Sequence, residues 1–447
     1  MKILKFGGTS VGSAQRIKDV TKLICDGALK IVVLSAMSGV TNSLVDISDF
    51  LHKKNQEGAT DTINKLLTKH LDVIEGLFNT EEYKQKATDV IISHFDHIRS
   101  LVKDSFTLAD EKIILAQGEL FSTHIIHYYL LEQGVQSVLL PALDFMRTDQ
   151  NVEPDLAYIT DHLHALLKAN ESAELFLTQG YICLNAKGEI DNLERGGSDY
   201  TASLIGAVVQ AEEIQIWTDI DGMHNNDPRI VENTTPVRHL HFDEAAELAY
   251  FGAKILHPTC IQPAKFNNIP VRLLNTMQPD APGTTISNKM EKGKIKAVAA
   301  KDHITAIKIK SGRMLLATGF LRKIFEIFEV YKTPIDMVTT SEVGVSATID
   351  NCKYLDEIVT DLKKYGVVTV DQDMTIVCVA GDLNWDNVGF ESTIINALKD
   401  IPIRMISYGG SNYNVSLLIK SSDKNKALQA LSRHLFKIGA TKSSSYN

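Results

Sequence analysis

Short apolar runs alternate with helix-length segments through the first two thirds of the sequence, and this alternation constrains the fold more than any other feature. The runs, which are the expected strands, are Ile3–Leu4, Ile31–Leu34, Ser137–Leu140, Glu174–Leu177, Ile214–Trp217 and Val271–Leu274. Apolar strands separated by helices are typical of an α/β domain whose mainly parallel sheet is covered by helices on both faces. Because ligands of such sheets bind beyond the carboxyl ends of the strands, the residues after each strand are the candidates for chemistry.

A glycine-rich turn follows the first expected strand, with the sequence Lys5-Phe6-Gly7-Gly8-Thr9-Ser10-Val11-Gly12, and a helix is expected over Ala14–Ile24. Glycines let the backbone approach an anion, and the following helix presents free N–H groups and the positive end of its dipole. Gly7 and Gly12 have the spacing of a P-loop, but Ser13-Ala14 stands where Lys-Ser or Lys-Thr would follow, and no G-x-G-x-x-G occurs. The turn therefore predicts either a phosphate site or a purely structural bend.

Length and charge exclude several classes of protein. The chain has 447 residues, so two or three domains are expected. A net charge of -9 and a pI near 5.9 argue against a nucleic-acid surface. The five cysteines are odd in number and scattered, which favours reduced thiols over disulfides or zinc. The glycine turn comes too early for a signal peptide, and no apolar run has membrane-spanning length, so we expect a soluble cytoplasmic protein that does not bind membranes.

The last third of the sequence contains a repeat with a period of roughly 70 residues, which predicts two small tandem β-α-β-β domains. Thr333–Val338 recurs as Ile401–Ile406. Each copy follows an amphipathic helix, whose expected apolar faces are Leu321, Ile324, Phe325 and Phe328 in the first copy and Ile394, Ile395 and Leu398 in the second. The strands after the copies are expected at Val345–Ile349 and Val415–Ile419. Asn288–Lys296, which is polar and basic, is the expected linker.

A second glycine turn lies in the segment Glu194-Arg195-Gly196-Gly197-Ser198-Asp199-Tyr200-Thr201, between an expected hairpin at Ala186–Glu189 and a helix over Ala202–Gln210. Glycine amides and an arginine at one helix start indicate an anion site. Asp199 alone is also explained as a helix cap, but a cap does not explain Arg195. The charged helical segment from Ala59 to Arg99 carries no motif, and we expect a solvated helical insertion there.

The motifs in this order resemble the aspartokinases of the amino acid kinase family, from Lys5 to about Phe436. The matching segments are KFGGTSVG at Lys5, SAMSGVTN at Ser35, QGE at Gln117, RGGSDYTAS at Arg195, TDIDGMHNNDPR at Thr218, FGAKILHP at Phe251, GFL at Gly319 and TTSEVGVS at Thr339. The resemblance implies ATP-dependent phosphorylation of the L-aspartate side chain, the entry to lysine, threonine and methionine synthesis. It also implies an amino acid kinase domain over residues 1–297 and two ferredoxin-like ACT domains of βαββαβ type over 303–374 and 375–447.

The resemblance assigns a role to each motif residue. It makes Lys5 and Asp199 catalytic, with Lys5 stabilising the transferring phosphoryl group and Asp199 organising the lysine, the water shell of Mg²⁺ or both. It places Lys5, Gly7, Gly8, Thr218, Asp219, His224, Arg229 and Lys254 around ATP. It places Ser35, Thr41, Glu119, Arg195 and Ser198 around aspartate. No protein-held metal is implied, because Mg²⁺ with ATP is held mostly by phosphates and water.

This arrangement answers a physical need, since two anions must meet and only positive charge and positioning bring them together. Two of these residues also have simpler explanations on their own. Glu119 is also explained as a residue on the solvent-exposed side of an amphipathic helix, and Lys254 as a surface lysine. Family members often have glycine at the position of Glu194 and tyrosine at the position of His224. The first departure adds negative charge beside the anion site, and the second replaces the tyrosine ring expected to stack on adenine with an imidazole.

The paired carboxyl-terminal domains imply regulation by an amino acid, with lysine as the expected effector and threonine left open. The resemblance places the effector at Met314, Gly319, Phe320, Leu321, Asp336, Ser341 and Glu342, although Phe320 and Leu321 also suit a small core. A homodimer or dimer of dimers is expected. Two alternatives remain: a kinase of glutamate, acetylglutamate or a nucleotide, and a catalytically silent amino-acid sensor. A fusion with homoserine dehydrogenase is not expected at this length.

Overall fold

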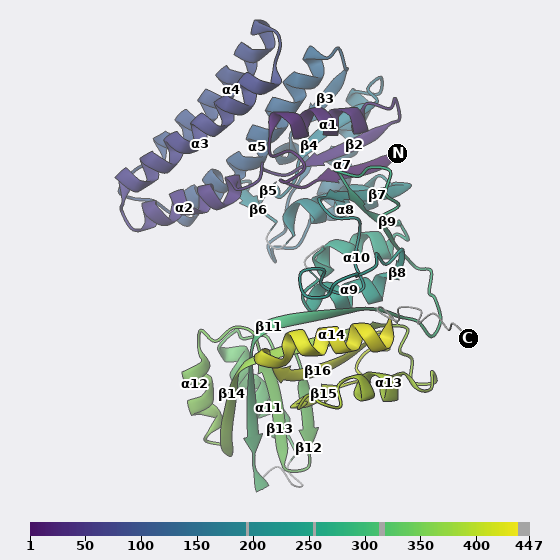
Figure 1. Ribbon diagram of the computed structural model, residues 1–447. Coiled ribbons are helices and arrows are strands. Elements are labelled where there is room, and N and C mark those ends of the chain that lie inside the picture. Colours follow the sequence, from purple (N-terminus) through teal and green to yellow (C-terminus); the bar gives the residue numbers. More distant parts are fainter. Residues whose placement is uncertain (194–195, 254–255, 313–317, 437–447) are drawn as a thin grey trace, which may run out of the picture. The chain divides into compact units, whose positions relative to one another are not determined.

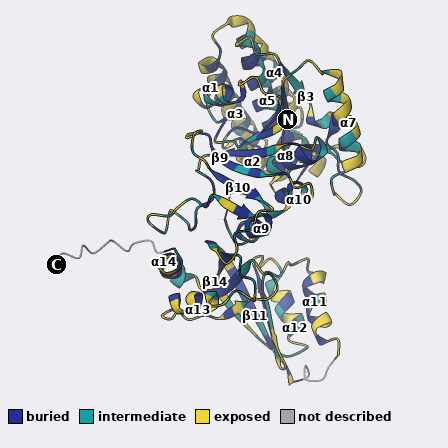
Figure 2. Cartoon of the chain, turned by 90° about the vertical axis from the view of Figure 1, so that its right-hand side faces the viewer, coloured by how far each residue is buried: buried dark blue, intermediate teal, exposed yellow. Residues whose placement is uncertain are grey.

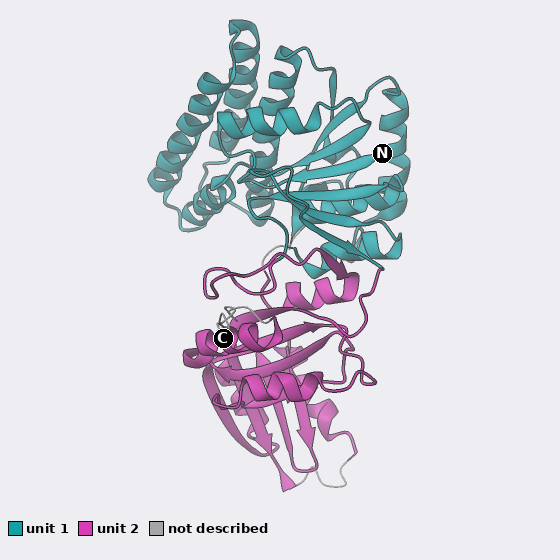
Figure 3. Ribbon diagram, turned by 45° about the vertical axis from the view of Figure 1, so that its right-hand side comes forward, with its two compact units in different colours: residues 1–223, 256–288 teal, residues 224–255, 289–447 magenta. Residues whose placement is uncertain are grey.

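The computed structural model describes residues 1–193, 196–253, 256–312 and 318–436. The chain forms two compact units (Figure 3). Unit 1 comprises Met1–Met223 and Leu256–Asn288, and unit 2 comprises His224–Ile255 and Lys289–Asn447. Among the described residues, none of the helices has the length and apolar character that a membrane crossing requires.

Strands and helices alternate along most of unit 1 (Figure 1). The strands are β1 (Lys2–Phe6), β2 (Lys30–Leu34), β3 (Ser137–Leu140), β4 (Leu175–Gln179), β5 (Ile182–Leu184), β6 (Ile190–Asn192), β7 (Glu213–Thr218), β9 (Val271–Asn275) and β10 (Thr284–Ser287). The helices are α1 (Ala14–Ile24), α2 (Val40–His52), α3 (Gln56–Leu77), α4 (Glu81–Ser100), α5 (Leu108–Glu132), α6 (Ala142–Phe145), α7 (Leu156–Ala169), α8 (Gly197–Val208) and α10 (Pro258–Phe266).

The main sheet of unit 1 is mainly parallel, as predicted. Its strands lie in the order β3-β4-β2-β1-β7-β9-β10. All neighbours pair in parallel except β9 and β10, which are antiparallel. Each expected strand of this region is present with ends within two residues of the prediction, and β5 and β6 form the expected hairpin. The carboxyl ends of β1, β2 and β7 therefore meet at one edge.

Helices cover both faces of this sheet, which explains why its strands are apolar throughout. Leu4 and Phe6 of β1 belong to a core shared with α1 and α5. Ile3 faces the other way, towards α8, where a Cβ on Gly206 would lie 2.6 Å from the Ile214 side chain. The small residue lets α8 approach the sheet closely. Figure 2 shows the resulting band of buried residues along the strands.

The segment from Ala59 to Arg99 is helical as predicted, but it is not merely a solvated insertion. It forms α3 and α4, and one face of each helix is buried. Ile63, Ile91 and Phe95 are fully buried in the same core as β1. Phe95 stacks on Phe121 of α5 with the ring centroids 4.7 Å apart. Apolar residues recur at helical spacing among the charged residues of this segment, and the sequence analysis did not identify them as a buried face.

Unit 2 contains a six-stranded sheet and its helices. The elements are β8 (His239–His241), α9 (Phe242–Tyr250), β11 (Ile295–Lys310), α11 (Phe320–Val330), β12 (Val338–Ser341), β13 (Gly344–Ile349), α12 (Leu355–Leu362), β14 (Val367–Gly381), α13 (Phe390–Ala397), β15 (Met405–Ser407), β16 (Asn414–Lys420), a 3₁₀ turn (Ser421–Asp423) and α14 (Lys424–Leu435). The sheet order is β12-β13-β11-β14-β16-β15, and its neighbours are antiparallel. The expected linker over Asn288–Lys296 ends inside β11.

The two predicted modules of unit 2 are interleaved. The second half of β11 pairs with the start of β14, and its Ile307 and Ile309 share a core with α11 and α12. The first half of β11 pairs with the end of β14, and its Val298 shares a second core with α13 and α14. Residues 295–301 thus supply a strand to the second module, although they precede the first. The proposed boundaries at 297, 303 and 375 do not include this exchange.

The expected apolar faces of the two repeat helices are partly wrong. Leu321 and Ile395 are 38% and 40% exposed. In α11 the buried face is Phe320, Ile324, Ile327 and Phe328, which has the i, i+4, i+7, i+8 spacing of a helix that begins at Phe320.

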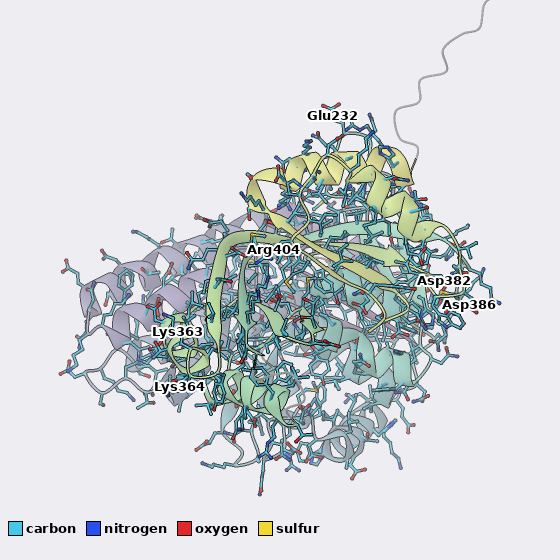
Figure 4. All side chains as sticks on the ribbon, turned by 90° about the horizontal axis from the view of Figure 1, so that it is seen from below. Glu232, Lys363, Lys364, Asp382, Asp386 and Arg404 are labelled. Carbon is cyan, nitrogen blue, oxygen red and sulfur yellow. The ribbon has the colours of Figure 1, made fainter. Side chains whose placement is uncertain are left out.

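The outer surface of unit 2 carries charges of both signs, with Lys363 and Lys364 beside α12 and Asp382 with Asp386 at a separate place (Figure 4).

Candidate active site

A cavity of about 500 Å³ opens in unit 1 at the carboxyl ends of β1 and β2. Its wall comes from β1 with its glycine turn, the loop after β2 with the start of α2, α5, the turn after β4, and the start of α8. The lining residues are Lys5, Gly8, Thr9, Ser35, Ala36, Met37, Ser38, Gly39, Thr41, Asn42, Glu119, Tyr181, Gly196, Gly197, Ser198 and Asp199. This is the sheet edge at which a parallel α/β sheet binds ligands.

The first glycine turn packs directly against the loop after β2. A Cβ on Gly8 would lie 2.6 Å from the Ala36 carbonyl oxygen, so this position accepts no side chain. The Ser38 N–H donates to the Gly8 carbonyl at 3.0 Å, and the Gly7 N–H donates to the Trp217 carbonyl at 3.3 Å. These bonds connect the turn to both neighbouring strand ends, so the glycines are required by close backbone packing as well as by any ligand.

The second glycine turn begins α8. Gly196 has φ 73° and is the N-cap residue, and a Cβ there would lie 2.4 Å from the Cys260 sulfur. A Cβ on Gly197 would lie 2.3 Å from the Tyr181 ring. This geometry puts Ser198 and Asp199 in the first helical turn, beside the cavity. Arg195, which was predicted to hold a carboxylate, and its neighbour Glu194 lie outside the described residues.

Lys5 and Asp199 form an ion pair on the cavity wall. The Lys5 Nζ lies 2.7 Å from Asp199 Oδ1, and the two side chains are 13% and 15% exposed. A charge pair that is largely shielded from water keeps its geometry better than an exposed one. The ammonium is therefore held in one position at the carboxyl end of β1.

Glu119 is a buried carboxylate in the same cavity. The residue is 4% exposed, Oε1 accepts a hydrogen bond from the Ala36 N–H at 3.2 Å, and Oε2 has no hydrogen-bond partner among the described residues. Burial raises the pKa of Glu119 to about 8, against the smaller opposing effects of its hydrogen bonds and the Lys5 charge. Burying an oxygen without a hydrogen-bond partner costs free energy. A ligand with a cationic group that bonds to this oxygen would remove that cost, so the site suits such a ligand.

Tyr181 is a cavity residue that the sequence analysis missed. It has φ 69°, and its N–H donates to Thr201 Oγ1 at 3.0 Å. Burial raises the pKa of its hydroxyl. Non-glycine residues rarely adopt this backbone conformation, and they do so mostly where surrounding bonds impose it. The only available signal was its position, two residues after β4 at the carboxyl edge of the sheet.

Three comparisons with known proteins bear on this geometry. A model of the amino acid kinase family matches residues 1–275, and an ACT domain model matches residues 377–435. Lysine-sensitive aspartokinase 3 of Escherichia coli is 32% identical over 97% of this chain and 99% of its own length. The chloroplastic aspartokinase 1 of Arabidopsis thaliana is 33% identical over 98% of this chain and 80% of its own length. The chain belongs to the aspartokinase family.

Solved aspartokinase structures have the same fold. The crystal structure of E. coli aspartokinase III in complex with aspartate and ADP matches with a TM-score of 0.87 and 30% identity, covering 98% of this chain and 100% of that chain. The complex of the same enzyme with lysine and aspartate matches with a TM-score of 0.80 and 31% identity, covering 98% and 99%. The predicted fold, an amino acid kinase domain followed by ACT domains, is confirmed.

The cavity brings together most of the residues predicted to bind aspartate in this aspartokinase. Ser35, Thr41, Glu119 and Ser198 all line it, together with Lys5, Gly8 and Asp199. Gly7 lies next to it in the glycine turn, where a Cβ would be 3.6 Å from the Lys5 nitrogen. The simpler explanation of Glu119 as a solvated helix residue is wrong, because the residue is buried.

The residues predicted to bind ATP belong to both units. Thr218 is the last residue of β7 and Asp219 follows it at the carboxyl edge of the sheet, where the Thr276 N–H donates to the Thr218 carbonyl at 2.8 Å. His224 and Arg229 belong to unit 2. Arg229 is paired with Asp227 at 2.8 Å, an interaction that lowers the pKa of the Asp227 carboxyl. Lys254 lies outside the described residues.

The residues predicted to bind the effector lie in the first module of unit 2. Gly319 has φ 82° and begins α11, while Phe320 is buried in the module core. The Asp336 side chain is only 2% exposed and lies 2.6 Å from Lys301. Ser341 and Glu342 are exposed at the end of β12. Met314 lies outside the described residues.

Proposed function

We propose that this protein is an aspartate kinase that transfers the terminal phosphoryl group of ATP to the side-chain carboxylate of L-aspartate and forms 4-phospho-L-aspartate. This reaction is the first step of lysine, threonine and methionine biosynthesis. One observation carries the proposal: a single cavity contains the buried carboxylate of Glu119, one oxygen of which has no partner among the described residues, and a cation at Lys5 that is held by an ion pair. An amino acid with a reactive carboxylate needs both groups.

The reaction requires charge neutralisation more than proton transfer. A carboxylate oxygen of the substrate attacks the γ-phosphorus, the bond to the β,γ-bridging oxygen breaks, and ADP leaves with its electron pair. The attacking carboxylate is already ionised near pH 7, so it needs no general base. Two like charges 4 Å apart repel by about 4 kcal/mol at an effective dielectric constant near 20. Lys5 offsets this repulsion, and Asp199 holds the Lys5 ammonium in place.

The other cavity residues are proposed to bind different groups of the substrate. Glu119 accepts hydrogen bonds from the α-ammonium group of aspartate, which supplies a partner that Oε2 does not have among the described residues. Ser35, Thr41 and Ser198 line the cavity, and their hydroxyls are proposed to donate hydrogen bonds to carboxylate oxygens of the substrate. Arg195 holds a carboxylate, as its motif position in the family implies.

ATP enters with Mg²⁺ in this proposal. Gly7, Gly8, Thr218, Asp219, His224, Arg229 and Lys254 are proposed to line the nucleotide. The described part of the chain offers no group of three or more His, Cys, Asp or Glu side chains arranged as a metal cage. The proposed Mg²⁺ ion is held mainly by the phosphates of ATP and by water, and Asp199 is proposed to contact its water shell.

Regulation by lysine through the first module is part of the proposal, with the effector held by Met314, Gly319, Phe320, Leu321, Asp336, Ser341 and Glu342. The buried Asp336 carboxylate, one oxygen of which has no hydrogen-bond partner among the described residues, suits an ammonium group. A homodimer or dimer of dimers assembled through the ACT modules, and a cytoplasmic location in keeping with the free cysteines, complete the proposal.

A hydroxamate assay tests the proposed function. Hydroxylamine traps an acyl phosphate, so the assay is run with ATP, Mg²⁺ and aspartate, glutamate or acetylglutamate in turn. We expect hydroxamate with aspartate alone. Product with glutamate or acetylglutamate would make the protein a different amino acid kinase, and no product with any of the three would favour the silent sensor. Adding lysine and then threonine identifies the effector, and indifference to both would leave the ACT modules without this role.

A further inference from the structure

One lysine of the α3–α4 segment reaches the candidate active site. Lys69 lies on α3, and its Nζ donates a hydrogen bond to the Ser38 carbonyl oxygen at 2.6 Å. A Cβ on Gly39 would lie 3.7 Å from the same nitrogen. Ser38 and Gly39 both line the cavity. The sequence analysis found no chemistry in this segment, and no motif of the resemblance includes it.

The helix that carries Lys69 is firmly fixed. Its neighbours on α3, Leu66 and His70, are 3% and 0% exposed in the core of unit 1. The His70 Nδ1 lies 2.7 Å from the Leu66 carbonyl, and the His70 ring contacts Phe121 edge-on. α3 runs beside α2 and α4 (Figure 1). The ammonium of Lys69 is therefore presented from a rigid element rather than from a loop.

The Ser38 carbonyl occupies a critical point in the cavity wall. The peptide unit is planar, so fixing this carbonyl fixes the plane of the Ser38–Gly39 bond. The Ser38 N–H is already bonded to the Gly8 carbonyl at 3.0 Å, and Gly39 is the left-handed N-cap residue of α2. Lys69 thus holds the Ser38–Gly39 peptide, which lies between the hydrogen bond to the first glycine turn and the start of α2.

The start of α2 has no side-chain cap at Gly39, and Thr41 and Asn42 of its first turn line the cavity. N–H groups at a helix start attract anions when they are correctly oriented. A positive charge bonded to the preceding carbonyl adds to that attraction and strengthens the hydrogen bond that sets the orientation. Both effects act on the end of the cavity where the proposed aspartate ligands Ser35 and Thr41 lie.

We infer that Lys69 is a positioning residue for the amino-acid subsite, in which its ammonium holds the Ser38 carbonyl and so fixes the wall formed by residues 35–42. The inference rests on the proposed function, because it concerns the binding of the anionic amino-acid substrate. Lys69 is not among the residues that line the cavity, and it acts on the cavity through the Ser38 carbonyl. Its removal therefore weakens uniform binding of the amino acid rather than the chemical step.

The test compares Lys69→Met, Lys69→Arg and a matched control, Lys65→Met, in the full-length protein. Lys65 is exposed, lies one turn earlier on α3 and has no ion pair or hydrogen bond in the described structure. We expect Lys69→Met to raise the KM for aspartate about tenfold, as loss of a charge-assisted hydrogen bond implies, with kcat and the KM for ATP within about twofold of wild type. Lys69→Arg should recover most of the affinity, and Lys65→Met should match the wild type.

Two results would overturn the inference. One is a Lys69→Met variant that is indistinguishable from Lys65→Met. The other is a Lys69→Met variant in which both KM values rise while kcat and the melting temperature fall, because that pattern indicates a purely structural lysine. The wild-type protein reports separately on the proposed function: if it phosphorylates another amino acid, that function is wrong, and the same KM comparison is made with the accepted amino acid.

Discussion

The Lys5 ammonium lies 2.7 Å from the Asp199 carboxylate, at the point where the first strand of the main sheet meets the start of α8. Each residue neutralises the other in a site that is largely shielded from water. We expect Lys5→Met to lower kcat by roughly a thousandfold, by analogy with other cations that stabilise phosphoryl transfer. ADP release in the presence of aspartate measures this effect. Near-normal turnover would remove Lys5 from its proposed role.

The same pair predicts a separation of stability from activity. Lys5→Met leaves the Asp199 carboxylate without its cation, so this variant should melt at a lower temperature than the wild type. The double variant Lys5→Met/Asp199→Asn has no unpaired charge, and we expect it to recover part of the lost melting temperature while remaining inactive. If the double variant is less stable than Lys5→Met, the ion-pair explanation is wrong.

Glu119 should control the affinity for aspartate and its pH dependence. Glu119→Gln keeps the shape but removes the charge, so the KM for aspartate should rise at least roughly tenfold while the KM for ATP is unchanged. Because burial raises the pKa of Glu119 to about 8, this carboxyl is mostly protonated in the unliganded protein at pH 7. Aspartate affinity should therefore increase from pH 7 to pH 8 in the wild type. A Gln variant with the same pH dependence would argue against this role.

Buried His70 should make the protein sensitive to acid. Burial lowers the pKa of His70 from 6.5 to about 4, and its Nε2 is buried without a described partner. Between these values the unfolded chain binds a proton that the folded chain does not, so stability falls as the pH decreases from 6.5 towards 4. At pH 5 this group alone accounts for roughly 2 kcal/mol. Urea unfolding at pH 7 and pH 5 should show a smaller difference for His70→Phe than for the wild type.

Asp336 should be required for inhibition by lysine but not for catalysis. Its buried carboxylate pairs with Lys301 and accepts a hydrogen bond from the Tyr250 hydroxyl at 3.0 Å. We expect Asp336→Asn to raise the lysine concentration for half-inhibition at least roughly tenfold, with uninhibited activity retained. Asp350→Asn is the control, because Asp350 shares the Lys301 ammonium at 2.9 Å but is 40% exposed. Equal effects of the two variants would contradict a specific role for Asp336.

The order of strands and helices and the positions of both glycine turns followed from the sequence. These features depend on residues that are close in the chain: apolar runs such as Ile31–Leu34 form strands, and Gly196 permits the left-handed turn that begins α8. The motif residues Lys5, Glu119 and Asp199 were also identifiable, because their neighbours match the family pattern.

Only the tertiary structure decided how these residues act on one another. Glu119 is buried with one partner among the residues that the structure describes, Tyr181 lines the cavity, and Lys69 holds the Ser38 carbonyl. All three result from segments far apart in the chain that pack against each other. The contribution of residues 295–301 of β11 to the second module has the same origin. Local patterns specify which element a residue joins, whereas burial, ion pairing and pKa depend on what the completed fold brings next to it.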